Sequence, residues 1–237
     1  MEFFGNTLYD VALWTLRREG CAERGPEYRQ LELLIQRYPQ LAPIQQEIHQ
    51  AYGILEQCYE KGGKLLIAGN GGSCADSEHI VGELMKGFCR KRPVPEAFEK
   101  RLAMADPVLG PELAAKLQGA LPAIALTGHP ALSTAYLNDV DGLLTFAQQV
   151  YGYGTEGDVL LGISTSGNSK NILYAMTAAR AKGMKTIGLT GKDGGALGRI
   201  ADAAIIVPEQ ETYRIQELHL PIYHTLCLML EEHFFPV

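Results

Sequence analysis

Runs of consecutive apolar residues recur along the chain and are separated by segments of helix length. Five such runs lie at 64–69, 122–127, 158–164, 185–190 and 203–208. None of them alternates with polar residues, which is typical of strands that are covered on both faces of a sheet. Helices are predicted over 75–88 and 169–182, with a short turn at 196–201. This alternation predicts an α/β fold with a doubly wound, parallel, five-stranded sheet.

The segments before and inside this alternation predict additions to one main domain. Residues 1–40 read as an N-terminal helical extension, with punctuation by Gly and Pro between two short helices. The main domain is predicted over 41–237 and begins with a longer helix at 41–60. A segment rich in Pro, Ala and Lys at about 92–119 interrupts the alternation. We interpret it as an insertion with two short helices, near 96–105 and 111–117.

The end of the chain predicts one long helix, over 211–235. Its residues 222–230 are so apolar that we expect them to be buried at an interface. Pro221 should kink this helix or mark a junction, because proline cannot donate the backbone hydrogen bond of a helix interior.

Charge and cysteine content exclude several classes of function. A formal net charge of -6 argues against a nucleic-acid partner, and the one basic run, CRKRP at 89–93, is expected to be a solvated turn. No window reaches the ~20 apolar residues of a membrane span, and the first residues lack a basic segment followed by an apolar one. The five cysteines are scattered and form no CxxC pair. We therefore expect a cytoplasmic protein with reduced thiols and no membrane partner.

Three of the predicted strands end in small, polar loops that suit an anion. These loops are GNGGS at 69–73, STSGNS at 164–169 and TGKDGG at 190–195. Glycine allows close backbone approach, and the helix that follows offers free N–H groups. Each loop alone could be a capped helix start, with Ser73 or Ser169 as the cap. Two such loops at the carboxyl ends of one sheet favour a bound phosphate.

The loops do not match the known nucleotide fingerprints. Cys74 occupies the position of the third glycine in the dinucleotide motif, and Asp193 follows the Gly-Lys pair where a P-loop needs Ser or Thr. We therefore expect no nucleotide cofactor and predict a small phosphorylated metabolite as the ligand.

Two segments supply candidates for acid–base chemistry. His79 and Glu83 are four residues apart and share one face of the helix after the first loop. Gln216 and His224 are eight residues apart, a little over two turns, and share a face of the last helix. Together these side chains could transfer protons or hold a divalent metal such as zinc. A partly buried, structural histidine is the alternative for each ring, and it is the one we adopt for His219 and His233.

The motifs GNGGS-x5-H-x3-E, GDVLLGISTSGNS, GMKTIGLTGKDGG and RIQELHLPIYH resemble those of the sugar isomerase (SIS) domain family, of the phosphoheptose isomerase type. The resemblance covers about residue 41 to the end, apart from the insertion. It implies a flavodoxin-like fold and aldose–ketose isomerisation of sedoheptulose 7-phosphate or a similar sugar phosphate through an enediol. It also implies a homotetramer whose sites take residues from neighbouring subunits.

The resemblance assigns roles to particular residues. Glu83 and His224 match the catalytic pair, and the zinc that some members bind would be held by His79, Glu83, Gln216 and His224. The expected substrate-binding residues are Asn70, Gly71, Gly72, Ser73, Ser164, Thr165, Ser166, Ser169 and Gln216. Departures occur at Cys74, Gly128 and Tyr213, where the family has histidine, an acidic residue and aspartate, and these affect the identity of the sugar.

Two other functions compete with isomerisation. Relatives of this domain serve as non-catalytic phosphosugar-binding modules in regulators, or bind a replication-initiation protein. A lyase or etherase acting on an amino-sugar phosphate could use the same phosphate loop and glutamate. The presence of the acid–base residues Glu83, Gln216 and His224 favours catalysis over binding alone.

Overall fold

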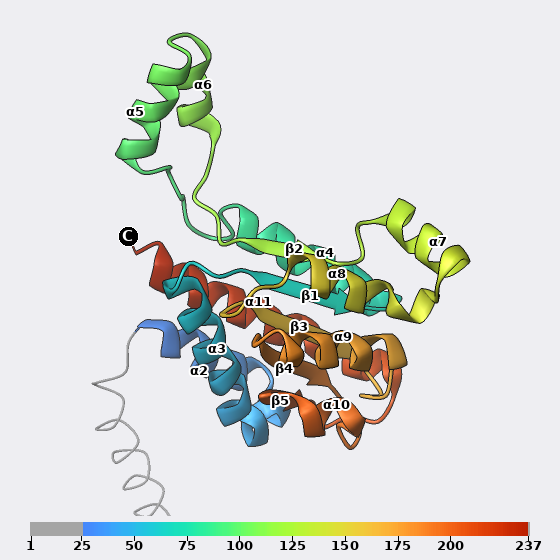
Figure 1. Ribbon diagram of the computed structural model, residues 1–237. Coiled ribbons are helices and arrows are strands. Elements are labelled where there is room, and N and C mark those ends of the chain that lie inside the picture. The colour runs from blue at the N-terminus through green and yellow to red at the C-terminus, as the bar shows by residue number, and fades with distance from the viewer. Residues whose placement is uncertain (1–25, 237) are drawn as a thin grey trace, which may run out of the picture.

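The computed structural model describes residues 26–236, and its centre is a five-stranded parallel sheet (Figure 1). The strands are β1 (Leu65–Gly69), β2 (Ala123–Ala125), β3 (Val159–Ser164), β4 (Lys185–Thr190) and β5 (Ala203–Ile206). They are ordered β2-β1-β3-β4-β5, and every neighbouring pair is parallel. This is the flavodoxin-like order of a doubly wound sheet, so the predicted fold class is confirmed.

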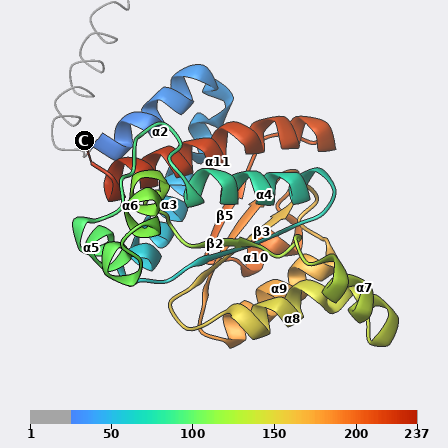
Figure 2. The same cartoon turned by 90° about the horizontal axis from the view of Figure 1, so that it is seen from above.

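Helices cover both faces of the sheet, which explains why its strands are apolar throughout (Figures 1 and 2). One face carries α2 (Pro26–Arg37), α3 (Gln45–Glu60), α4 (Gly72–Met85) and α11 (Thr212–Phe234). The other carries α8 (Thr145–Tyr153), α9 (Lys170–Ala181) and α10 (Gly195–Ile200). In β1, Leu65 and Ile67 are buried in the first core, whereas Leu66 and Ala68 are buried in the second. Each layer therefore has its own hydrophobic core.

The chain leaves β1 and β3 toward opposite faces of the sheet. β1 leads into α4 on one face, and its neighbour β3 leads into α9 on the other. A crevice forms outside the carboxyl ends of two such strands, and ligands of open α/β sheets bind there. The loops at 69–73 and 164–169 meet at this crevice.

The structure contains two helices that the sequence analysis did not predict. α7 (Pro130–Asp139) and α8 follow β2 and are joined by a short 3-10 turn, Gly142–Leu144. α7 buries none of its residues, and α8 buries only Thr145, Gln149 and Val150. α7 therefore carries no apolar stripe, because none of it faces a core.

The insertion forms a helical hairpin that projects away from the sheet (Figure 1). Its helices are α5 (Glu96–Ala105) and α6 (Leu109–Lys116), close to the two predicted positions. Met104 and Val108 near its tip are 85% and 78% exposed. At its base, Arg92 contradicts the prediction of a solvated basic turn: its side chain is fully buried and paired with Glu231. The opposite charge lies 139 residues away, so the local pattern could not indicate the pair.

The apolar part of the last helix is buried inside the chain itself. α11 packs against α2, α3 and α4, and Ile222, Leu226 and Met229 are almost fully buried. The helix continues through Pro221. Contacts within one chain thus account for the apolarity from which an interface was predicted. Of the predicted extension, α2 packs on α11, while residues 1–25 lie outside the described residues. The helices over residues 26–236 include no apolar stretch of membrane-spanning length.

Candidate active site

α4 and α11 lie side by side and run in the same direction (Figure 2). At the start of α4, a Cβ atom on Gly72 would collide with the amide of Gln216. Further along, His79 contacts Tyr223, with 3.1 Å between Nδ1 and the hydroxyl oxygen. Gly72, Asp76, His79 and Glu83 share one face of α4, because their spacing follows the helical repeat. This face is the one that α11 covers.

The predicted acid–base residues come together where these two helices meet. Nε2 of His79 lies 3.2 Å from Oε1 of Glu83 and 3.5 Å from Nε2 of His224. The His79 side chain is 43% exposed and that of Glu83 only 12%, so the cluster opens to solvent on one side. Burial, reinforced by the nearby His79, lowers the pKa of His224. His224 is therefore mainly neutral near pH 7 and can accept a proton.

Lys86 belongs to this cluster, although the sequence analysis did not select it. Its Nζ donates to Oε2 of Glu83 at 3.1 Å. The spacing of three residues on one helix was a signal that could have identified the pair. Lys86 thus engages one carboxylate oxygen of Glu83, while the other faces His79.

Tyr223 and Asp76 form a second, deeper part of the site that sequence reasoning also missed. The hydroxyl of Tyr223 donates to Oδ1 of Asp76 at 3.2 Å and lies against His79. Burial raises the pKa of Asp76, and burial together with the Asp76 charge raises that of Tyr223. The residues are 147 positions apart, which is why spacing could not reveal them.

The predicted metal ligands are only partly brought together. In a tetrahedral zinc site with bonds of about 2.0–2.1 Å, neighbouring ligand atoms lie about 3.3 Å apart, close to the two distances from His79 Nε2. Gln216 instead contacts Gly72, about two helical turns away along α4. Among residues 26–236, no three His, Cys, Asp or Glu side chains are grouped so that they could hold a metal ion. The residue types suit zinc, but the described geometry does not assemble the four-ligand set, because Gln216 lies beside Gly72 and away from the other three side chains.

The loop at 164–169 has the form of an anion cradle. The hydroxyls of Ser164 and Ser169 are 2.8 Å apart, and the backbone N–H of Asn168 donates to Oγ of Ser166. Gly167 has φ of +65°, and a side chain there would collide with the backbone of Gly194 in the neighbouring loop. Only glycine allows this close packing of the two loops.

The first loop is tied to the second through a pair of amides. Asn70 and Asn171 exchange two hydrogen bonds, of 3.0 and 2.8 Å, between the end of β1 and the first turn of α9. Gly71 and Gly72 are exposed at the start of α4, whereas Ser73 is only 3% exposed. The two predicted phosphate loops thus lie side by side at the carboxyl ends of β1 and β3, and Thr165 and Ser166 are partly exposed there.

The three departures from the family pattern each follow a strand of the sheet, namely β1, β2 and β5. Cys74 is in the first turn of α4, Gly128 follows β2, and Tyr213 is in the first turn of α11. Tyr213 is 56% exposed. The buried His219, predicted to be structural, faces the backbone oxygen of Thr190 at 3.3 Å, and burial lowers its pKa to about 4.

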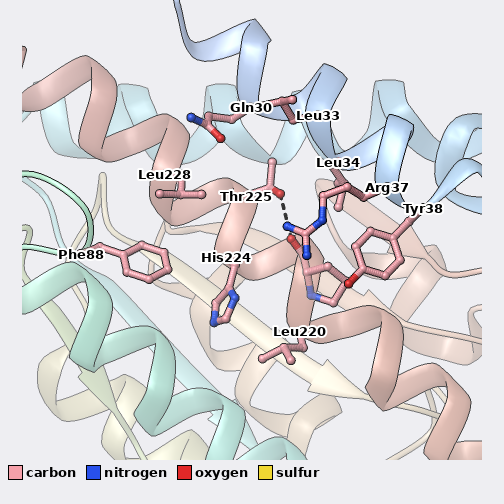
Figure 3. Close-up of a pocket in the computed structure, with 11 residues that line it drawn as sticks. Gln30, Leu33, Leu34, Arg37, Tyr38, Phe88, Leu220, His224, Thr225 and Leu228 are labelled. Carbon is pink, nitrogen blue, oxygen red and sulfur yellow. Dashed lines mark hydrogen bonds between the residues drawn. The ribbon is translucent and has the colours of Figure 1, made fainter.

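His224 also lines a cavity of about 370 Å³ between α2 and α11 (Figure 3). Arg37 and Tyr38 from the end of α2 form one wall, and Phe88 lies on the other side of the His224 ring. The ring centroids of Phe88 and His224 are 5.4 Å apart. Contacts on this side restrict the orientation of the imidazole that approaches His79.

Comparisons with known proteins agree on one family. The SIS domain family matches residues 112–191. The phosphoheptose isomerase of Nitratiruptor sp. is 44% identical over 171 residues, which cover 72% of this chain and 78% of the relative. The solved phosphoheptose isomerase of Neisseria gonorrhoeae has a TM-score of 0.65 and 31% identity, covering 92% of this chain and 99% of the other. The solved phosphoheptose isomerase of Francisella tularensis has a TM-score of 0.65 and 36% identity, covering 78% of this chain and 85% of the other.

Proposed function

Because the chain belongs to the phosphoheptose isomerase family and is a phosphosugar isomerase, we propose that it interconverts a ketose phosphate and an aldose phosphate through an enediol. Sedoheptulose 7-phosphate is the substrate that the family name supports best. The observation that carries the proposed mechanism is the meeting of three side chains between α4 and α11: Nε2 of His79 lies 3.2 Å from Oε1 of Glu83 and 3.5 Å from Nε2 of His224.

Aldose–ketose isomerisation moves a proton between adjacent carbons and adjusts the protons on their oxygens. Glu83 would remove the carbon proton and return it to the neighbouring carbon, because its carboxylate is partly shielded and held by Lys86. His224 would transfer the proton between the sugar oxygens, since its lowered pKa leaves it neutral. The serines at 164–169 would hold the phosphate and so fix the distance to the reacting carbons.

We also propose that one zinc ion binds at His79, Glu83, Gln216 and His224. Two imidazoles and a carboxylate are common zinc donors, and the His79 ring lies 3.2 Å from Glu83 and 3.5 Å from His224. When bound, zinc would polarise the sugar carbonyl as a Lewis acid. Elemental analysis of protein purified without chelator should find about one zinc per chain. Absence of metal, with no response of activity to added zinc, would contradict this part of the proposal.

The non-catalytic binding module is not favoured, because curated isomerases align over most of the chain. We further propose a homotetramer in the cytoplasm. The free thiols of Cys58, Cys74, Cys89 and Cys227 support a reducing compartment, and exposed apolar residues such as Leu33 and Leu220 on α2 and α11 support assembly. Light scattering should give four times the mass of one chain, and a monomer would contradict the assembly.

The reaction is tested with a panel of five- to seven-carbon ketose phosphates. Each is incubated with the purified protein, and formation of the aldose is followed by NMR. We expect sedoheptulose 7-phosphate to be converted. Conversion of a shorter sugar phosphate instead would change the assigned substrate but not the proposed reaction. No turnover of any member, with binding retained, would overturn the proposed reaction and revive the binding module.

A further inference from the structure

The side-chain amides of Asn70 and Asn171 bridge the two predicted phosphate loops. Asn70 directly follows β1, and Asn171 lies in the first turn of α9, two residues after Ser169. Nδ2 of Asn70 donates to Oδ1 of Asn171 at 3.0 Å, and Nδ2 of Asn171 donates to Oδ1 of Asn70 at 2.8 Å. The bridge therefore joins the end of β1 to the helix that follows β3, at the edge where ligands of such sheets bind. Asn171 has no part in the function described so far.

The backbone of α9 fixes the orientation of the Asn171 amide. The N–H of Ile172 donates to Oδ1 of Asn171 at 3.0 Å. If the amide were turned over, its NH2 group would face this N–H, and two donors would oppose each other. Oδ1 of Asn171 thus accepts from Ile172 and from Asn70, which uses both of its lone pairs.

The fixed amide of Asn171 in turn fixes that of Asn70. Turning over Asn70 alone would set NH2 against NH2 and oxygen against oxygen, so both hydrogen bonds of the bridge would be lost. The bridge uses one N–H and one lone pair of Asn70, which leaves one N–H to donate and one lone pair to accept. Asn70 is exposed, so a ligand at this edge of the sheet can reach these groups.

We propose that Asn171 is a positioning residue for substrate binding: it holds the amide of Asn70 so that the remaining N–H is ready for an oxygen of the bound sugar phosphate. The identity of this ligand rests on the proposed function, whereas the orientation of Asn70 does not. An amide that is held in place before the ligand arrives loses less conformational freedom on binding. Asn171 should therefore affect affinity rather than the chemical step.

A double-mutant cycle tests whether Asn171 acts through Asn70. Binding of sedoheptulose 7-phosphate to the full-length protein is measured by calorimetry, and KM and kcat by steady-state kinetics. Asn171→Ala should raise Kd and KM by about 5- to 10-fold and change kcat by less than about twofold. Asn70→Ala should weaken binding at least as much, and adding Asn171→Ala to it should then have little further effect. Equal losses of affinity from Asn171→Ala in both backgrounds would overturn the inference.

Thr177→Ala is the matched control on the same helix. Oγ1 of Thr177 donates to the backbone oxygen of Leu173 at 2.9 Å, so this variant also loses a side-chain hydrogen bond of α9. It should leave Kd, KM and kcat unchanged. A similar rise of KM in Thr177→Ala would show that Asn171→Ala acts by weakening α9, and the positioning role would then be wrong.

Side-chain amide NMR of the unliganded protein gives a readout that needs no substrate. The Asn70 signals are assigned by their loss in Asn70→Ala, and nitrogen relaxation reports the motion of this amide. We expect a rigid Asn70 amide in the unaltered protein and in Thr177→Ala, and a mobile one in Asn171→Ala. An amide that stays rigid in Asn171→Ala would contradict the inference. If the unaltered protein converts no sugar phosphate, the proposed function fails, while this measurement still decides whether Asn171 orients Asn70.

Discussion

Nε of Arg92 donates to Oε1 of Glu231 at 2.8 Å, with the two side chains 0% and 1% exposed. The other nitrogens of Arg92 donate to the backbone oxygens of Leu84 and Glu83, which lie in the last turn of α4. Glu231 also accepts from the backbone N–H groups of residues 88 and 89. This buried network joins the end of the helix that carries Glu83 to the end of α11.

Removing one partner of this pair should strongly destabilise the fold. Arg92→Leu leaves the Glu231 carboxylate buried without its counter-charge, which costs about 3–5 kcal/mol of unfolding free energy. Urea denaturation followed by circular dichroism measures this loss. Lys100→Ala, in an exposed pair with Glu96, should change it by less than about 0.5 kcal/mol. The double variant Arg92→Leu, Glu231→Leu should be more stable than Arg92→Leu alone, and a single-variant loss below about 1 kcal/mol would contradict this account.

Asp158 should make stability fall in acid. Burial alone would raise the pKa of Asp158, but hydrogen bonds from Lys64 and Thr155 outweigh it, so the pKa lies below its usual value. A carboxylate with a lowered pKa in the folded state stabilises the protein above the unfolded pKa of about 3.9 and loses this contribution as pH falls through the folded value. Asp158→Asn should therefore lower the unfolding free energy at pH 7 by about 1–3 kcal/mol. The difference in unfolding free energy between Asp158→Asn and the unaltered protein should shrink when denaturation is repeated near pH 3. A difference that does not depend on pH would refute the lowered pKa of Asp158 as its cause.

Lys86 should matter for activity and hardly at all for stability. Its side chain is 56% exposed, and such a surface pair contributes less than about 1 kcal/mol. Lys86→Met removes the donor to Oε2 of Glu83, so the carboxylate loses its fixed orientation. We expect kcat/KM to fall by about tenfold or more, because a misplaced group slows the reaction steeply. Lys91→Met, at an exposed position of the following loop, is the control that should retain activity. Equal kcat/KM values in the two variants would show that Lys86 has no role in orienting Glu83.

Features that follow from local pattern were predictable from the sequence. The continuous apolar runs indicated all five strands, because a strand covered on both faces needs apolar side chains on both. The polar loops at 69–73 and 164–169 were recognisable because they follow two of these strands directly. The spacing of His79 and Glu83 placed them on one helical face, and the structure shows that α11 covers that face.

Features that depend on distant residues were not predictable in this way. Arg92 was expected to be in a solvated turn because its partner, Glu231, is far along the chain. Tyr223 looked like one more apolar residue of α11, and only the packing of α4 reveals its contact with Asp76. α7 was missed because none of its side chains is buried, so no apolar stripe marks it. In each case the missing information was tertiary packing.

The central claim is that Glu83 moves the carbon-bound proton, and incorporation of solvent deuterium tests it most directly. The full-length protein and Glu83→Gln are incubated in deuterium oxide with the converted ketose phosphate, and the label at the second carbon of the aldose is measured by NMR. We expect rapid incorporation with the unaltered protein. Glu83→Gln should show a loss of about 100-fold or more, while binding of the sugar phosphate stays within a few-fold, because glutamine keeps the shape but cannot accept the proton. Deuterium incorporation at the unaltered rate in Glu83→Gln would contradict the account.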